Sequence, residues 1–174
     1  MLTLRPEGWY PDGLSEALYG SLDPQRLKPE ISRLRNVLGL AVTRPPYRLE
    51  TPLWADYLEL ETALARGKFH KAVRLYRGPL APGSEAPGVV EHRHYLEALL
   101  KDTLLRTHQA PLLLALVEWF PEDLEVLEAV RERLPEVHPA RPYLEGRIAA
   151  LRAEYEPTAL MQSPATSGNR KSAP

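Results

Sequence analysis

The prolines place the strongest constraint on how this chain can fold. Eighteen of its 174 residues are proline, about twice the usual share of roughly 5%. Most of them stand between apolar stretches, where a missing amide hydrogen and a fixed φ end a helix rather than kink it. The pattern therefore predicts a mostly helical protein built from short helices joined by turns.

The composition narrows the class of protein further. Apolar residues make up 44% of the chain and charged residues 26%, which is ordinary for a globular protein and excludes wholesale disorder. The absence of cysteine excludes disulfides, thiolate-bound zinc and cysteine-held iron–sulfur clusters. The longest near-apolar run, Ala110 to Phe120, contains Pro111 and Glu118 and is far shorter than the ~20 residues of a membrane span. No charged-then-apolar leader opens the sequence, so a soluble, cytoplasmic protein is expected.

The first fifty residues predict two helices and a hairpin. Met1 to Trp9 is expected to be a helix end or short strand that runs into a turn. A first helix should begin at Pro11-Asp12 and end at Gly20, and a second should have Asp23 as its N-cap and Pro24 at its first position. Their expected inward residues are Leu14, Ala17 and Leu18, then Leu27, Ile31, Leu34 and Leu38. Val42 to Leu49 is typical of two extended arms that turn at Arg44-Pro45-Pro46.

The rest of the chain predicts six more helices and a tail. The helices are expected near 53–66, 69–76, 89–107, 112–120, 122–134 and 140–155, with turn residues from Gly78 to Gly83. Expected inward residues include Leu53, Tyr57, Leu60 and Leu64 in the first of these, Leu96, Leu99, Leu100, Thr103 and Leu104 in the third, and Leu144, Ile148, Leu151 and Tyr155 in the last. Residues 157–174 are rich in Ser, Thr, Pro, Ala and Gly and are expected to be disordered.

The charge is unevenly distributed although the net charge is only −1. The segment from Arg26 to Arg48 contains six basic residues and one acidic residue, an excess of +5 in 23 residues. Residues 51–160 carry 13 basic and 17 acidic side chains, a net charge of −4. A local basic excess is a candidate phosphate-binding surface. The alternative is a solvated basic face without a partner, and charge alone does not separate the two.

The polar residues do not form a recognisable catalytic pattern. His92 and His94 are two residues apart and point to different sides of a helix. Glu91 and His94 have the spacing of carboxylate-bridged metal sites, but the second pair that such sites require is missing. Gly-rich phosphate loops, dinucleotide fingerprints and a nucleophile elbow are also missing. We therefore expect no metal, no cofactor and no enzymatic activity.

The second helix and the hairpin form the most informative unit. If the apolar residues of this helix pack inward, Lys28, Ser32, Arg33 and Asn36 point outward and Arg35 lies on the flank. Such side chains can contact phosphates and base edges, and the hairpin adds Arg44 and Arg48 at the same end. A merely soluble surface helix would also carry outward polar residues, so this alternative stays open.

Two stretches resemble a known family. The first region resembles a response-regulator-type winged helix. The resemblance is carried by Leu4-Arg5-Pro6-Glu7-Gly8, Gly13 to Gly20, Ile31-Ser32-Arg33-Leu34-Arg35, Leu38-Gly39 and Arg44 to Leu49. The second region is similar to the bacterial transcriptional activator domain that follows such winged helices in antibiotic-regulator-type activators. This similarity is carried by Ala65-Arg66-Gly67-Lys68-Phe69, Ala72 and Leu75 to Gly83. That domain is built of tetratricopeptide-like helix pairs, and the small residues Gly67 and Ala72 would let two helices approach closely.

The resemblance implies a transcriptional regulator. Its domains would be a winged-helix DNA-binding domain at 1–50 and a helical activator-like domain at 51–156, followed by the tail. The DNA-binding residues would be Lys28, Ser32, Arg33, Arg35, Asn36, Arg44 and Arg48. The expected partners are double-stranded DNA, RNA polymerase or another regulatory protein, and a second copy in a homodimer. The rival hypothesis is a helical interaction scaffold whose shortened winged helix binds protein instead of DNA.

Two features depart from the family pattern. A first helix precedes the turn in such winged helices, and here only Met1 to Leu4 remain to supply it. The start codon is then assigned too far downstream, or another chain supplies the helix, or this copy has lost DNA binding. Pro29 is the second departure, because inside a helix begun at Pro24 it would remove a hydrogen bond. Alternatively, 24–28 is a turn and Pro29 occupies the first helical position.

Overall fold

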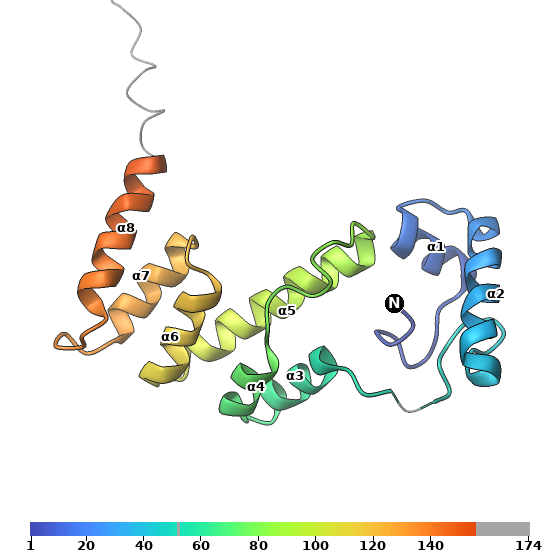
Figure 1. Ribbon diagram of the computed structural model, residues 1–174, viewed down its shortest axis with the longest axis horizontal. Helices are drawn as coiled ribbons and strands as arrows, with labels where there is room; N and C mark the ends of the chain where they lie inside the picture. The colour runs from blue at the N-terminus through green and yellow to red at the C-terminus, as the bar shows by residue number, and fades with distance from the viewer. Residues whose placement is uncertain (52, 156–174) are drawn as a thin grey trace, which may run out of the picture. The chain divides into compact units, whose positions relative to one another are not determined.

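The described residues of the computed structural model, 1–51 and 53–155, form eight α-helices, and extended backbone pairs there only at isolated bridges (Figure 1). This confirms the mostly helical class. The expected tail, 157–174, lies outside the described residues. No described helix is both long enough and apolar enough to span a membrane. The helices are α1 (Pro11–Tyr19), α2 (Leu27–Leu38), α3 (Asp56–Ala65), α4 (Phe69–Leu75), α5 (Pro87–Leu105), α6 (Ala110–Trp119), α7 (Leu124–Arg133) and α8 (Arg141–Tyr155).

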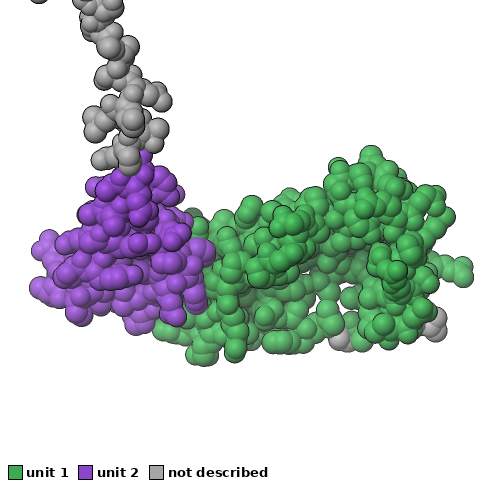
Figure 2. Space-filling model, turned by 45° about the horizontal axis from the view of Figure 1, so that its top comes forward, with its two compact units in different colours: residues 1–107 green, residues 108–174 purple. Residues whose placement is uncertain are grey.

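The chain divides into two compact units, residues 1–107 and residues 108–174, which Figure 2 shows in different colours. The first unit contains α1 to α5 and the second contains α6 to α8. The predicted boundary near residue 50, between a DNA-binding and an activator-like domain, stays a prediction.

The signals that start and stop α1 and α2 act largely as expected. Gly20 ends α1 with a φ of +69°, which glycine adopts without strain. The Asp23 carboxylate accepts a hydrogen bond from the Gln25 amide at 3.2 Å, but it caps a short 3₁₀ turn, Pro24–Arg26, and α2 begins only at Leu27. Asp23 and Pro24 thus hold the predicted cap and first position, but of a 3₁₀ turn that runs into α2, and the alternative start at Pro29 is wrong. Pro29 falls in the first turn of α2, where its missing amide hydrogen costs no helical bond.

The helix pair predicted around Gly67 is present. α3 and α4 pack side by side (Figure 1), joined by a turn in which Gly67 has a φ of +66°. Ala72 of α4 is fully buried. α3 also packs against α5, whose buried residues are Leu96, Leu100 and Leu104.

The first turns of α5 pack against α1. A Cβ atom added to Gly88 would lie 3.0 Å from the Ala17 Cβ and 2.5 Å from the end of the Met1 side chain, so the two helices touch at a glycine. The hydroxyls of Thr3 and Tyr57 are joined by a hydrogen bond. The beginning of the chain therefore contacts both α3 and α5.

The second unit is a three-helix arrangement in which α7 packs against both α6 and α8. The Asp123 carboxylate caps α7 by accepting from the Val126 amide at 3.1 Å. The Arg141 guanidinium donates to the carbonyls of Arg131 and Leu134 and so holds the start of α8 against the end of α7. The buried residues of these helices include Leu112, Leu113, Leu116, Leu127, Val130, Leu144, Ile148 and Leu151.

Three expected core residues are exposed instead. Leu38 is 43% exposed, Leu53 is 55% exposed and Tyr155 is 69% exposed. Leu38 and Tyr155 are the last residues of their helices, and Leu53 precedes the first turn of α3. Helical spacing identifies a face of a helix, but it does not show where the neighbouring element stops covering that face.

Candidate nucleic-acid interface

α2 has one buried and one exposed face. Leu27 and Ile31 are 1% and 6% exposed and belong to a core cluster with Trp9 and Leu14. Lys28, Ser32 and Asn36 are exposed and recur every four residues, so they lie in one row along the helix. The helix thus presents an unbroken polar face about two turns long.

Arg33 lies beside this row and is largely exposed. Its guanidinium forms an ion pair with the Glu30 carboxylate at 2.8 Å, across one helical turn. Because the side chain of Arg33 is 75% exposed, this pair is worth only a few tenths of a kcal/mol, as is usual for exposed (i, i+3) pairs. Arg33 can exchange Glu30 for another anion at little cost.

The extended arms predicted after α2 pair with each other and with the beginning of the chain. Val42 and Leu49 form an antiparallel bridge. Trp9 and Tyr47 form a second bridge, in which each amide donates to the other's carbonyl, at 2.8 and 2.9 Å. The segment before α1 therefore adds a third extended piece to the hairpin, which the sequence analysis left open.

This third piece requires a glycine at position 8. Gly8 has a φ of +98°, and a Cβ atom there would lie 3.0 Å from the Pro46 Cβ and 3.2 Å from the Tyr47 carbonyl oxygen. No other residue combines this backbone conformation with such a close approach. Gly8 thus allows Trp9 to pair with Tyr47 beside the turn of the hairpin.

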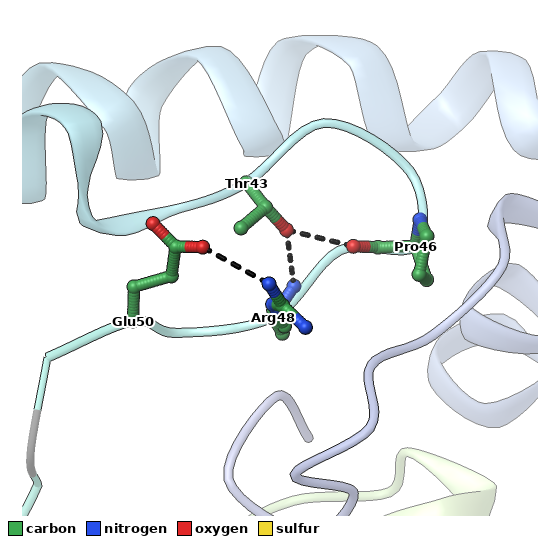
Figure 3. Close-up of polar contacts among 4 residues, drawn as sticks. All are labelled: Thr43, Pro46, Arg48 and Glu50. Carbon is green, nitrogen blue, oxygen red and sulfur yellow. Dashed lines mark hydrogen bonds and ion pairs between the residues drawn. The ribbon is translucent and has the colours of Figure 1, made fainter.

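Thr43 holds the tip of the hairpin closed (Figure 3). Its hydroxyl donates to the Pro46 carbonyl at 2.7 Å and accepts from the Arg48 amide at 3.0 Å. The Arg48 guanidinium forms an exposed ion pair with Glu50 at 3.1 Å, as Figure 3 shows. Arg44 is exposed at the turn.

Arg35 connects α2 to the hairpin. Its Nε donates to the Val42 carbonyl at 3.3 Å and its Nη2 donates to the Thr43 carbonyl, and its guanidinium lies 5.9 Å from the centre of the Tyr47 ring. These contacts bring the C-terminal half of α2 against the hairpin arm. Lys28, by contrast, lies about 10 Å away from Arg35 along the helix axis, at 1.5 Å per residue.

The seven candidate residues therefore differ in their surroundings. Lys28, Ser32, Asn36 and Arg44 are exposed, Arg33 and Arg48 are exposed but paired with carboxylates, and Arg35 is engaged with backbone carbonyls. The roles of Glu30 and Glu50 were not predicted from the sequence. Their positions carried a signal, since residues three apart on a helix and two apart on an extended arm lie on the same side.

The histidines do not gather with other ligands. Among residues 1–51 and 53–155, no three His, Asp or Glu side chains are grouped closely enough to hold a metal ion. His92 lies half-buried, with its Nε2 3.3 Å from a Glu61 carboxylate oxygen and the Tyr57 ring edge-on to its own. Burial lowers the pKa of His92 and raises the pKa of Glu61.

Part of the chain is similar to a helical family. Residues 118–157 match a family described as "YTH3-like protein, third C-terminal helical domain"; α7 and α8 make up most of this stretch. The chain is also 35% identical over 158 residues to an "Uncharacterized 47.3 kDa protein in thcA 5'region" of Rhodococcus erythropolis. That alignment covers 87% of this chain and 36% of the relative, so the chain spans about a third of that protein's length. No solved structure matches.

Proposed function

We propose that this chain is a cytoplasmic, DNA-binding transcriptional regulator of the winged-helix and tetratricopeptide-like type, in which α2 is the recognition helix and the hairpin from Val42 to Leu49 is the wing. The observation that carries the proposal is the row formed by Lys28, Ser32 and Asn36, which is exposed about a quarter-turn around α2 from the buried Leu27 and Ile31. Cations and amides in such a row suit contacts with both phosphates and base edges.

The hairpin supports the same proposal from a second element. Arg44 at its tip and Arg48 on its second arm are exposed, and Arg35 anchors the first arm, at Val42 and Thr43, to α2. A recognition helix needs a second, positively charged contact to set its orientation on a duplex, and phosphate contacts supply this. In this proposal Arg35 positions the hairpin, while Arg44 and Arg48 bind phosphates.

The rival proposal, a protein-binding scaffold, draws on the paired arginines. Glu30 and Glu50 already neutralise Arg33 and Arg48, and Arg35 is engaged with carbonyls. A surface whose charges are balanced in this way also suits a protein partner with few charges.

Duplex binding as a function of salt separates the two proposals. The full chain should bind a fluorescent duplex of mixed sequence, with an affinity that falls steeply as salt rises. Arg44→Ala and Arg48→Ala should each weaken binding on all sequences and reduce the slope of log K against log salt by about one. Arg33→Ala should cost about 1–3 kcal/mol mainly on a preferred site.

Arg74→Ala is the matched control, because Arg74 is an exposed arginine on α4 and its loss changes the net charge equally. It should leave the slope unchanged. If the parent binds no duplex at low salt, or if Arg74→Ala weakens binding as much as Arg44→Ala does, the DNA-binding proposal fails and the scaffold takes its place.

A further inference from the structure

One face of α5 borders on empty space. The helix buries Leu96, Leu100 and Leu104 in the core. A second stripe, roughly a quarter-turn away, recurs at spacings of four, three, four and four, and so lies on one face. Its members line cavities instead of filling the core: Gly88, His92, Tyr95, Leu99 and Thr103.

Two cavities follow this stripe. The first, about 600 Å³, lies where the start of the chain and α1 meet the first turns of α5, and Trp9 and Ala17 form part of its wall. The second, about 370 Å³, lies between α3 and α5, and Leu64 and Leu99 line it. Tyr95 lines both cavities, so they adjoin and form a groove along α5.

The length of this groove matches a helix. Only the part of the stripe beyond Gly88 is open, because Gly88 packs against Ala17 and Met1. Tyr95 and Thr103 are eight residues apart on α5, which corresponds to about 12 Å, or about two helical turns, at 1.5 Å per residue. The walls carry apolar side chains at intervals, and Tyr95, which is 51% exposed, stands where the two cavities meet.

The groove has a small excess of acidic groups, three carboxylates against two cations. The carboxylates of Glu16, Glu61 and Glu91 line it, and Glu16 and Glu91 are exposed. The opposing cations are the amino group of Met1, whose pKa is lowered by burial, and Arg5. Arg5 lies over the Trp9 ring at 3.9 Å. His92 adds little positive charge at neutral pH, because burial lowers its pKa.

We propose that the groove along α5 binds an amphipathic helix of a partner protein, with apolar residues at i, i+3 or i+4 and i+7 and lysine or arginine beside them. The apolar side chains would contact Leu64, Tyr95 and Leu99, and the cations would face Glu16, Glu61 and Glu91. Helix-in-groove binding of this kind uses three or four apolar anchors for affinity and charge complementarity for selectivity. This site is separate from α2 and the hairpin, so it goes beyond the proposed function.

The test uses three end-blocked synthetic peptides of about five helical turns and the full chain. The first peptide has a leucine face flanked by lysine, the second carries glutamate in place of lysine, and the third is a scramble of the first. Fluorescence anisotropy should show binding of the first peptide, weakening with salt, and little binding of the other two. Tyr95→Ala should weaken it about tenfold or more, and Glu91→Lys should weaken it as well.

Tyr143→Ala is the matched control, since Tyr143 is an exposed tyrosine on α8, and it should leave peptide binding unchanged. Circular dichroism checks that each variant is folded. Duplex binding by Tyr95→Ala should equal that of the parent, so the two proposals can fail separately. Equal binding of the scramble, preference for the acidic peptide, or equal effects of the two tyrosine variants would overturn the proposal. A dimer that is seen in sedimentation and is dissociated by Leu99→Arg would also overturn the proposal, because a second copy of the chain would then occupy the groove.

Discussion

At the scale of single residues, the carboxylates beside Arg33 and Arg48 govern how much positive charge α2 and the hairpin offer. Both ion pairs are exposed, and such pairs contribute about 0–1 kcal/mol. A phosphate can therefore displace the carboxylate, but it must compete with it. This competition can be measured.

Replacing Glu50 should tighten duplex binding. Glu50→Gln removes the partner of Arg48 and one negative charge near the hairpin, so affinity at low salt should rise about two- to fivefold, in line with the small energy of an exposed pair. Glu145→Gln on α8 (exposed) is the control for net charge. Fluorescence anisotropy measures both variants. No difference between them would show that Arg48 does not contact DNA.

Ser15 should matter more for stability than its size suggests. It is fully buried, donates to the Ser21 carbonyl at 2.7 Å and accepts from the Asp23 amide at 2.9 Å. Ser15→Ala leaves both backbone groups without this partner and should cost about 1–3 kcal/mol in urea unfolding. Ser32→Ala, at an exposed position, should change stability by less than about 0.5 kcal/mol. Equal effects would contradict the role of Ser15 in joining α1 to α2.

His92 should make the first unit less stable in mild acid. Burial, and then the nearby amino terminus, lower its pKa from the ordinary value of 6.5, so below about pH 6.5 the unfolded chain binds more protons than the folded one. The contribution of His92 to stability is present above this pH and is lost as the pH falls toward the folded pKa. The raised pKa of Glu61 acts in the opposite direction, with stability lost as the pH rises through the range above 4.5.

Unfolding in urea at pH 7.5, 6.5 and 5.5 measures the effect of His92. The parent should lose more stability across this range than His92→Gln does. A parallel decline in both proteins would show that His92 titrates as it does in an unfolded chain.

At the scale of helices, the contact between α1 and α5 leaves no room for a side chain at Gly88. Alanine is normally better than glycine inside a helix by about 1 kcal/mol. At Gly88, however, the added methyl would meet Ala17 at 3.0 Å from its Cβ and 3.2 Å from its carbonyl. Overpacking of this kind costs typically 1–3 kcal/mol, which outweighs the gain in helix propensity.

Gly88→Ala should therefore destabilise the first unit. Gly146 of α8 is the matched control, because a Cβ atom there meets no atom within 4 Å, and Gly146→Ala should stabilise its unit by about 0.5–1 kcal/mol. Thermal unfolding followed by circular dichroism compares the two variants. Stabilisation by both would mean that α1 and α5 are not in contact.

Most helix boundaries could be predicted from the sequence, because prolines, glycines and apolar periodicity act locally. α3 to α8 begin and end within about three residues of the expected positions, consistent with ordinary uncertainty at helix ends. The predicted start at Pro24 is that of a 3₁₀ turn, and α2 itself begins three residues later, at Leu27. Long-range contacts leave weaker signals: neither the packing of Gly88 on Ala17 nor the pairing of Trp9 with Tyr47 follows from any local pattern.

The candidate site was predictable to a similar degree. The exposed row of Lys28, Ser32 and Asn36 follows from helical geometry once Leu27 and Ile31 face inward. The hydrogen bonds of Arg35 to the carbonyls of Val42 and Thr43 do not follow from helical geometry, because they depend on how the hairpin folds back on α2.

At the scale of the whole molecule, opposite charges lie on different elements of the first unit. The basic excess from Arg26 to Arg48 lies on α2 and the hairpin, whereas the acidic residues of the α5 groove lie on α1, α3 and α5. A chain with one basic and one acidic surface can bind a nucleic acid and a basic helix at separate sites. The central claim is that the first of these surfaces contacts DNA.

Nuclear magnetic resonance of the ¹⁵N-labelled full chain, titrated with a short duplex of mixed sequence at low salt, tests this claim most directly. The account predicts that the amide signals of Lys28, Ser32, Asn36, Arg44 and Arg48 shift with added duplex while those of α8 stay in place, and that added salt reverses the shifts. Shifts confined to α6 to α8, or no shifts at all at low salt, would contradict it.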